Sequence, residues 1–146
     1  MINVSDVTRT VVKILTEDPT LSDVKSVERG EYVNMDPARS PWIGVYRTEV
    51  VYAPHTLGSH SRSWSATLTI KMIVQIHDAD GLKAEDSLEE LIQRVMSVML
   101  ADLTLREYVQ MLNSIRVQYS YDETESNTMD YQWAFITLIY EARTGV

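Results

Sequence analysis

The sequence contains no cysteine among its 146 residues. A disulfide and a thiolate metal site are therefore both excluded. The absence also favours a reducing compartment, such as the cytosol, over a secretory pathway. A chain of this length does not need a disulfide or a structural metal for stability, because it is long enough to bury a sizeable hydrophobic core.

Glycine, basic charge and long apolar runs are also scarce. Five glycines leave no glycine-rich loop of the kind that cradles phosphate groups. The formal net charge of −8 disfavours binding to a nucleic-acid backbone. No apolar stretch approaches the roughly 20 residues of a membrane-spanning helix, and residues 1–15 lack the pattern of a secretory signal. We expect that the protein neither crosses a membrane nor binds nucleic acid specifically.

What is present is the composition of an ordinary globular domain. Hydrophobic residues make up 45% of the chain and charged residues 23%, which is too apolar for intrinsic disorder. No repeat, low-complexity tract or linker divides the sequence. We therefore predict a single domain over residues 1–146.

Hydrophobic spacing predicts two main helices and four to five strands. Helical spacing covers residues 4–15 and 84–100. Strict alternation over residues 63–77 is typical of a long strand with one buried face. Weaker patterns predict strands at 26–33, 42–52, 115–121 and 131–143, and a short helical or turn segment at 103–112. The fold class is therefore α+β, with a mostly antiparallel sheet packed against the two helices.

The three histidines do not form a recognisable metal or catalytic site. His55 and His60 share the loop at residues 53–62, but no thiolate or carboxylate adjoins them as a ready ligand. The simpler interpretation is an exposed hairpin connection. His77 ends the alternating strand on its polar side and is expected to be solvated.

Asp78, Asp80 and Gly81 match the middle of a calcium-binding loop. The first and twelfth positions of that loop would be Ile76 and Ser87, where carboxylates are needed. A turn before the second helix explains the same residues. We expect no calcium site here.

A group of carboxylates marks the first half of the second helix, at Glu85, Asp86, Glu89 and Glu90. Paired carboxylates can act as acid and base, but negative charge at this position also suits the positive end of the helix dipole. No nucleophile motif accompanies them. We therefore predict no catalytic residue, no cofactor and no metal, and a protein that is not an enzyme.

Several segments, in their order along the chain, resemble phage tail terminator or tail-completion proteins, of which the λ-type minor tail protein U is an example. These segments are P-W-I-x-V at residues 41–45, EDSLEELIQRVMSVMLAD at 85–102, IRVQYSYDE at 115–123 and YQWAFITLIYEAR at 131–143. The resemblance spans roughly residues 6–143 and depends on pattern rather than on invariant residues.

This resemblance implies a structural role in a virion. Proteins of the family cap the finished tail tube as a ring, commonly a hexamer, which stops polymerisation and offers a surface to the neck or head. The implied partners are further copies of the chain, the tail tube protein and a neck or head-completion protein. The implied location is the head-proximal end of the tail, after assembly in the host cytoplasm. DNA would pass through such a ring, and the negative charge of the protein would repel the phosphates of the DNA and keep the DNA from binding.

A ring requires a heterologous interface, in which one surface of each subunit meets a different surface of the next. The closing strand is apolar on both faces, and its candidate interface residues are Tyr131, Trp133, Phe135, Ile139 and Tyr140. A purely core role for these side chains remains the alternative. The candidate docking residues for the tube or neck lie in the loop at 53–62 and are His55, Thr56, Leu57, His60 and Arg62.

Three other functions remain open from the sequence. One is a neck or head-completion connector, which would share the ring but bind the portal side. Another is a cap protein of a bacterial contractile injection device. The third is a small enzyme or ligand-binding α+β domain that uses His55 and His60.

Overall fold

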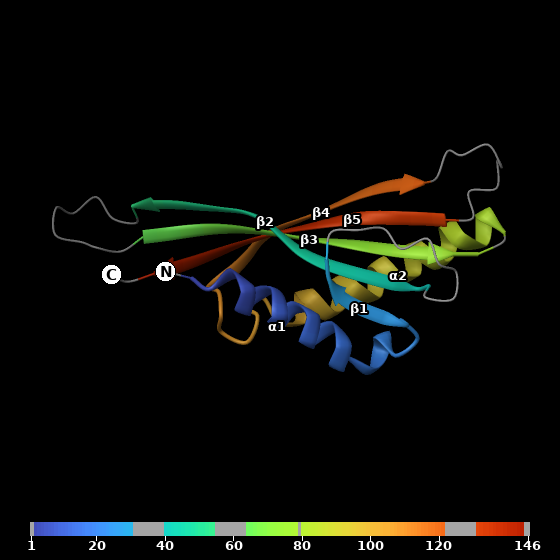
Figure 1. Cartoon of the computed structure of the whole chain (residues 1–146), viewed down its shortest axis with the longest axis horizontal. Coiled ribbons are helices and arrows are strands. Elements are labelled where there is room, and N and C mark those ends of the chain that lie inside the picture. Colours follow the sequence, from blue (N-terminus) through green and yellow to red (C-terminus); the bar gives the residue numbers. More distant parts are fainter. Residues whose placement is uncertain (1, 31–39, 55–63, 79, 122–130, 145–146) are drawn as a thin grey trace.

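The computed structural model describes residues 2–30, 40–54, 64–78, 80–121 and 131–144. Two helices, a short 3₁₀ helix and five strands follow one another along the chain, as Figure 1 shows. Their bounds are α1 (Val4–Glu17), η1 (Pro19–Leu21), β1 (Ser26–Arg29), β2 (Trp42–Pro54), β3 (Trp64–His77), α2 (Gly81–Ala101), β4 (Met111–Tyr121) and β5 (Tyr131–Thr144).

The five strands form one sheet in the order β1-β2-β3-β5-β4. β1 runs parallel to β2, and every other neighbouring pair is antiparallel. Both long helices lie against the same face of this sheet (Figure 1). The predicted α+β class and mostly antiparallel sheet are therefore confirmed. None of the described helices is long and apolar enough to cross a membrane.

The helix starts are fixed by side chains that cap exposed backbone N–H groups. Asn3 Oδ1 accepts a hydrogen bond from Asp6 N at 3.2 Å, which begins α1. Asp80 Oδ1 accepts one from Leu82 N at 3.0 Å and begins α2. Asp80 is therefore a helix cap, and α2 begins three residues before the predicted position 84.

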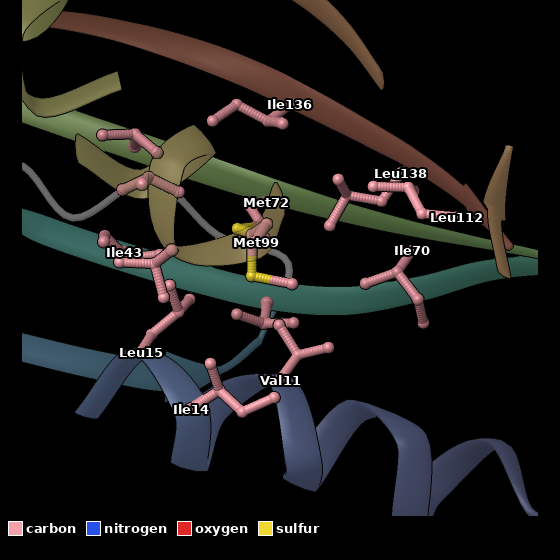
Figure 2. Close-up of a cluster of buried hydrophobic side chains, with 14 of the residues drawn as sticks. Val11, Ile14, Leu15, Ile43, Ile70, Met72, Met99, Leu112, Ile136 and Leu138 are labelled. Atoms are coloured by element: carbon pink, nitrogen blue, oxygen red, sulfur yellow. The ribbon is translucent and has the colours of Figure 1, made fainter. Parts of the chain in front are cut away.

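The main core lies between the helices and one face of the central strands. Along β3 and β5 the even-numbered residues face inward and pair across the sheet, as in Leu68 with Tyr140 and Met72 with Ile136. These side chains are almost completely buried. Figure 2 shows Met72 close to Met99 of α2, above the helix α1. Met99 is 1% exposed and belongs to this core.

Trp42 folds over Gly44 on the opposite face of the sheet. A Cβ atom placed on Gly44 would lie 2.9 Å from Trp42 Cζ2 and 2.9 Å from the carbonyl oxygen of Gly30. Only glycine therefore leaves room for the indole, which is 1% exposed. Because Trp42 and Gly44 alternate with the core residues Ile43 and Val45, this packing defines a second apolar cluster away from the helices.

The segment after α2 is a turn rather than a helix. Leu105, Arg106 and Glu107 have φ angles of 48°, 57° and 71°, in the left-handed region that non-glycine residues rarely occupy. Asp102 holds this turn, because its carboxylate accepts hydrogen bonds from Thr104 N at 3.2 Å and Arg106 N at 2.8 Å. The buried side chain of Leu105 anchors it to the core. The sequence predicted either a short helix or a turn at 103–112, and the structure shows the turn.

Replacement of Glu107 by glycine is expected to stabilise the fold. A left-handed conformation costs a non-glycine residue about 1–2 kcal/mol, and glycine removes most of that strain at some expense in chain entropy. We expect the free energy of unfolding to rise by about 1 kcal/mol in urea denaturation. Gln93→Gly, at an exposed site within α2, is the control and should lower it by about 1 kcal/mol. Equal destabilisation by both changes would contradict the strain argument.

Candidate functional site

The sheet face opposite the helices carries an apolar patch, here called the aromatic patch. It consists of Trp42, Ile73, Trp133 and Phe135, which the strand register places side by side: Trp42 and Trp133 both flank Gln75, and Ile73 pairs with Phe135. Trp42 and Ile73 are buried, whereas Trp133 and Phe135 are half-buried. Within the described ranges no helix covers this face (Figure 1). The patch is thus available in part to a partner.

The closing strand divides its candidate interface residues between two faces. Trp133, Phe135 and Ile139 lie on the face without helices, and all three are half-buried. Tyr140 lies on the other face, fully buried in the main core. Tyr131 is the first residue of β5 and pairs with His77. The structure therefore brings three of the five together on one accessible face.

Tyr140 has an unusual environment within the core. Its hydroxyl is buried and has no hydrogen-bond partner within the described parts of the chain. Burial, with a smaller contribution from the Asp102 carboxylate, raises the pKa of the phenol far above its ordinary value. The side chain is therefore neutral and contributes to packing in the isolated subunit.

Strands β2 and β3 project past the N-terminal end of α1 (Figure 1). Their last described pair is Pro54 with Trp64, and Trp64 is 39% exposed. The candidate docking residues of the connecting loop, His55, Thr56, Leu57, His60 and Arg62, lie outside the described residues. What the structure describes is the pairing of β2 with β3 up to Pro54 and Trp64.

An acidic cleft of about 590 Å³ lies between α2 and the end of the sheet. Glu85, Asp86 and Glu89 line it from the helix, and Tyr119 lines it from β4. The Tyr119 hydroxyl donates a hydrogen bond to Glu89 Oε2 at 2.7 Å, which raises the pKa of the phenol. Within the described residues no group of three or more His, Asp or Glu side chains is arranged to hold a metal ion.

Two arginines that the sequence did not single out lie beside β2. Arg29 and Arg47 line a hollow of about 230 Å³ between α1 and the sheet, together with Gly30 and Thr8. Arg47 donates a hydrogen bond to Ser5 Oγ at 2.8 Å. In the described part of the chain neither arginine forms an ion pair. No local motif marks them, because only the pairing of β1 with β2 brings them together.

Comparisons with known proteins give similarity to solved structures but not to sequence families. No protein-family model and no curated protein sequence matches this chain. Among solved structures, a chain described as part of the "virion of native gene transfer agent (GTA) particle" is similar at a TM-score of 0.44. The identity is 9%, and the match covers 94% of each chain. At these values the similarity is weak and carries no argument about function.

Proposed function

We propose that this chain is a non-enzymatic structural subunit of a phage-like particle, and that it forms a ring that caps a tail tube as a tail terminator. The proposal combines the sequence resemblance with one structural observation. That observation is the sheet face without helices, where Trp133, Phe135 and Ile139 are only half-buried.

Half-buried apolar side chains on a sheet face that no described helix covers are typical of a surface that another protein covers. Trp133 and Phe135 flank the buried Ile73 and form one continuous surface with it. Large aromatic side chains supply much of the binding energy at protein interfaces. We assign this surface to contact between copies of the chain, since a closed ring needs interfaces of this kind around its whole circumference.

The projecting hairpin supports separate contact surfaces within the subunit, one for self-assembly and one for another component. Strands β2 and β3 stay paired as far as Pro54 and Trp64, past the N-terminal end of α1 (Figure 1). A loop that connects strands at such a distance from the core can contact a neighbouring component without disturbing that core. We assign it to the tail tube or the neck protein, and the sheet face to self-assembly.

Deletion of residues 55–60 is expected to separate these two roles. The shortened protein should keep its fold and its assembled mass, because the deletion removes no residue of the described strands β2 and β3, but it should no longer end tail tubes at a fixed length. Electron micrographs of assembled tails measure that length directly. The double variant His55→Ala, His60→Ala is the matched control and should behave like the unmodified protein. Tails of normal length from the deletion, or loss of assembly through the histidine changes alone, would refute this assignment.

A further inference from the structure

The sheet has two edges that lack a strand partner among the described residues, and they lie on opposite sides of the molecule. One is the outer edge of β4 along Met111–Tyr121. The other is the part of β2 beyond β1, at residues 47–54, because β1 pairs only with Trp42–Val45. Unpaired edges expose rows of backbone donors and acceptors that readily pair with another strand.

The edge of β4 has little protection against such pairing, whereas the edge of β2 carries Arg47, Glu49, Pro54 and a bulge at Arg47/Glu49. β4 is 11 residues long, contains no proline or lysine, and has Arg116 as its only charged residue. Its bulge at Leu112/Ser114 affects only one end. Met111 and Tyr119 of this strand are more than half exposed. Monomeric proteins usually shorten, charge or cover an edge strand of this length.

The space between the edge of β2 and helix α1 is only partly filled. Two hollows of about 230 and 320 Å³ follow this edge, and Val4 and Thr8 of α1 form part of their lining. They occur where β1 ends and β2 continues without a neighbour. A strand laid alongside residues 47–54 would fill this gap and cover the exposed part of α1.

Strand direction makes the two edges compatible. β4 runs antiparallel to β5, β5 antiparallel to β3, and β3 antiparallel to β2. β4 and β2 therefore run in opposite directions. If the sheet of one copy continues into the sheet of the next, with the helices on the same side, β4 meets β2 as an antiparallel pair.

Charge also favours this pairing over the joining of two identical edges. Glu85, Asp86 and Glu89 lie beside β4, with no cationic partner among the described residues. Arg29 and Arg47 lie beside the edge of β2, with no anionic partner there. A β4-to-β4 contact would oppose two acidic groups, whereas β4 against β2 brings opposite charges together.

We propose that β4 of one copy pairs antiparallel with residues 47–54 of β2 of the next copy, so that one sheet continues from subunit to subunit. This inference rests on the proposed function, namely that the chain assembles with itself. The interface is heterologous, since each copy uses one edge to donate and the other to accept, and repetition of the same contact can close a ring. It also places Val51 of the neighbour on the same sheet face as Phe135.

Cysteine cross-linking tests this pairing cleanly, because the chain has no cysteine of its own. Val51→Cys is combined in turn with Ser114→Cys, Arg116→Cys and Gln118→Cys, all on the face without helices. Directly opposed residues of an antiparallel pair approach closely enough for a short bis-maleimide to join them. At least one combination should give a ladder of dimers, trimers and larger products on a denaturing gel. Each single variant should stay uncross-linked.

The control is Val51→Cys with Gln93→Cys, which lies on an exposed part of α2 and should give no ladder. Cross-linked dimers from Gln118→Cys alone would overturn the proposal, because they require two β4 edges to meet. Assembled protein without a ladder from any combination would also overturn it and leave the proposed ring function standing. A single-chain mass for the unmodified protein would refute both.

Discussion

A single aspartate at position 135 is expected to convert the assembled protein into separate chains of 16.7 kDa. Phe135 is half-buried in the aromatic patch, where it pairs with the buried Ile73. In the proposed assembly Val51 of the next copy lies on the same sheet face as position 135, so a carboxylate there would meet an apolar neighbour without gaining a partner. Such a change at the centre of an interface weakens association by about 100-fold. Size-exclusion chromatography with light scattering measures the loss.

Two further variants make this result interpretable. Gln93→Asp adds the same charge on an exposed part of α2 and should leave the assembled mass unchanged. Phe135→Thr keeps a residue that favours strands while removing the aromatic ring, so it should weaken assembly with little effect on the fold. Circular dichroism reports whether each variant is folded. A folded Phe135→Asp protein that assembles like the unmodified chain would exclude the patch from the interface.

Replacement of Leu91 by alanine is expected to have the largest effect on stability. Leu91 lies in the middle of α2, is completely buried, and belongs to the main core between helix and sheet. Removal of most of such a side chain leaves a cavity and lowers the free energy of unfolding by about 2–5 kcal/mol. Urea denaturation, followed by circular dichroism at one fixed protein concentration, measures this change because assembly also affects stability.

The matched control is Leu100→Ala in the same helix. Leu100 is 51% exposed, so the same chemical change removes little buried surface. We expect a change within about 0.5 kcal/mol. Equal losses at the two positions would mean that α2 does not pack against the sheet through the face that contains Leu91.

Strand and helix positions were predictable where a periodic pattern continued without interruption. The alternation at 63–77 corresponds closely to β3, Trp64–His77, because each inward residue of this central strand meets the core. β4 begins at Met111 rather than at residue 115, because the bulge at Leu112/Ser114 breaks the alternation at its start. The start of α2 was missed because a capping side chain, Asp80, determines it rather than an apolar spacing.

The candidate site was predictable only in part. The alternation of side chains along a strand places Phe135 and Ile139 on one face of the sheet and Tyr140 on the other. It does not reveal which of the two faces the helices cover. That choice depends on where α1 and α2 pack, and it leaves Tyr140 in the core. The free edges of β2 and β4 follow from the strand order, which the local sequence does not contain.

The mass of the purified 146-residue chain in solution is the most direct test of ring formation. Native mass spectrometry, repeated over a series of dilutions, gives the number of copies in each particle. We expect one closed species of more than two copies that persists on dilution, with six times 16.7 kDa as the mass of the proposed hexamer. A mass of 16.7 kDa at every concentration would contradict it.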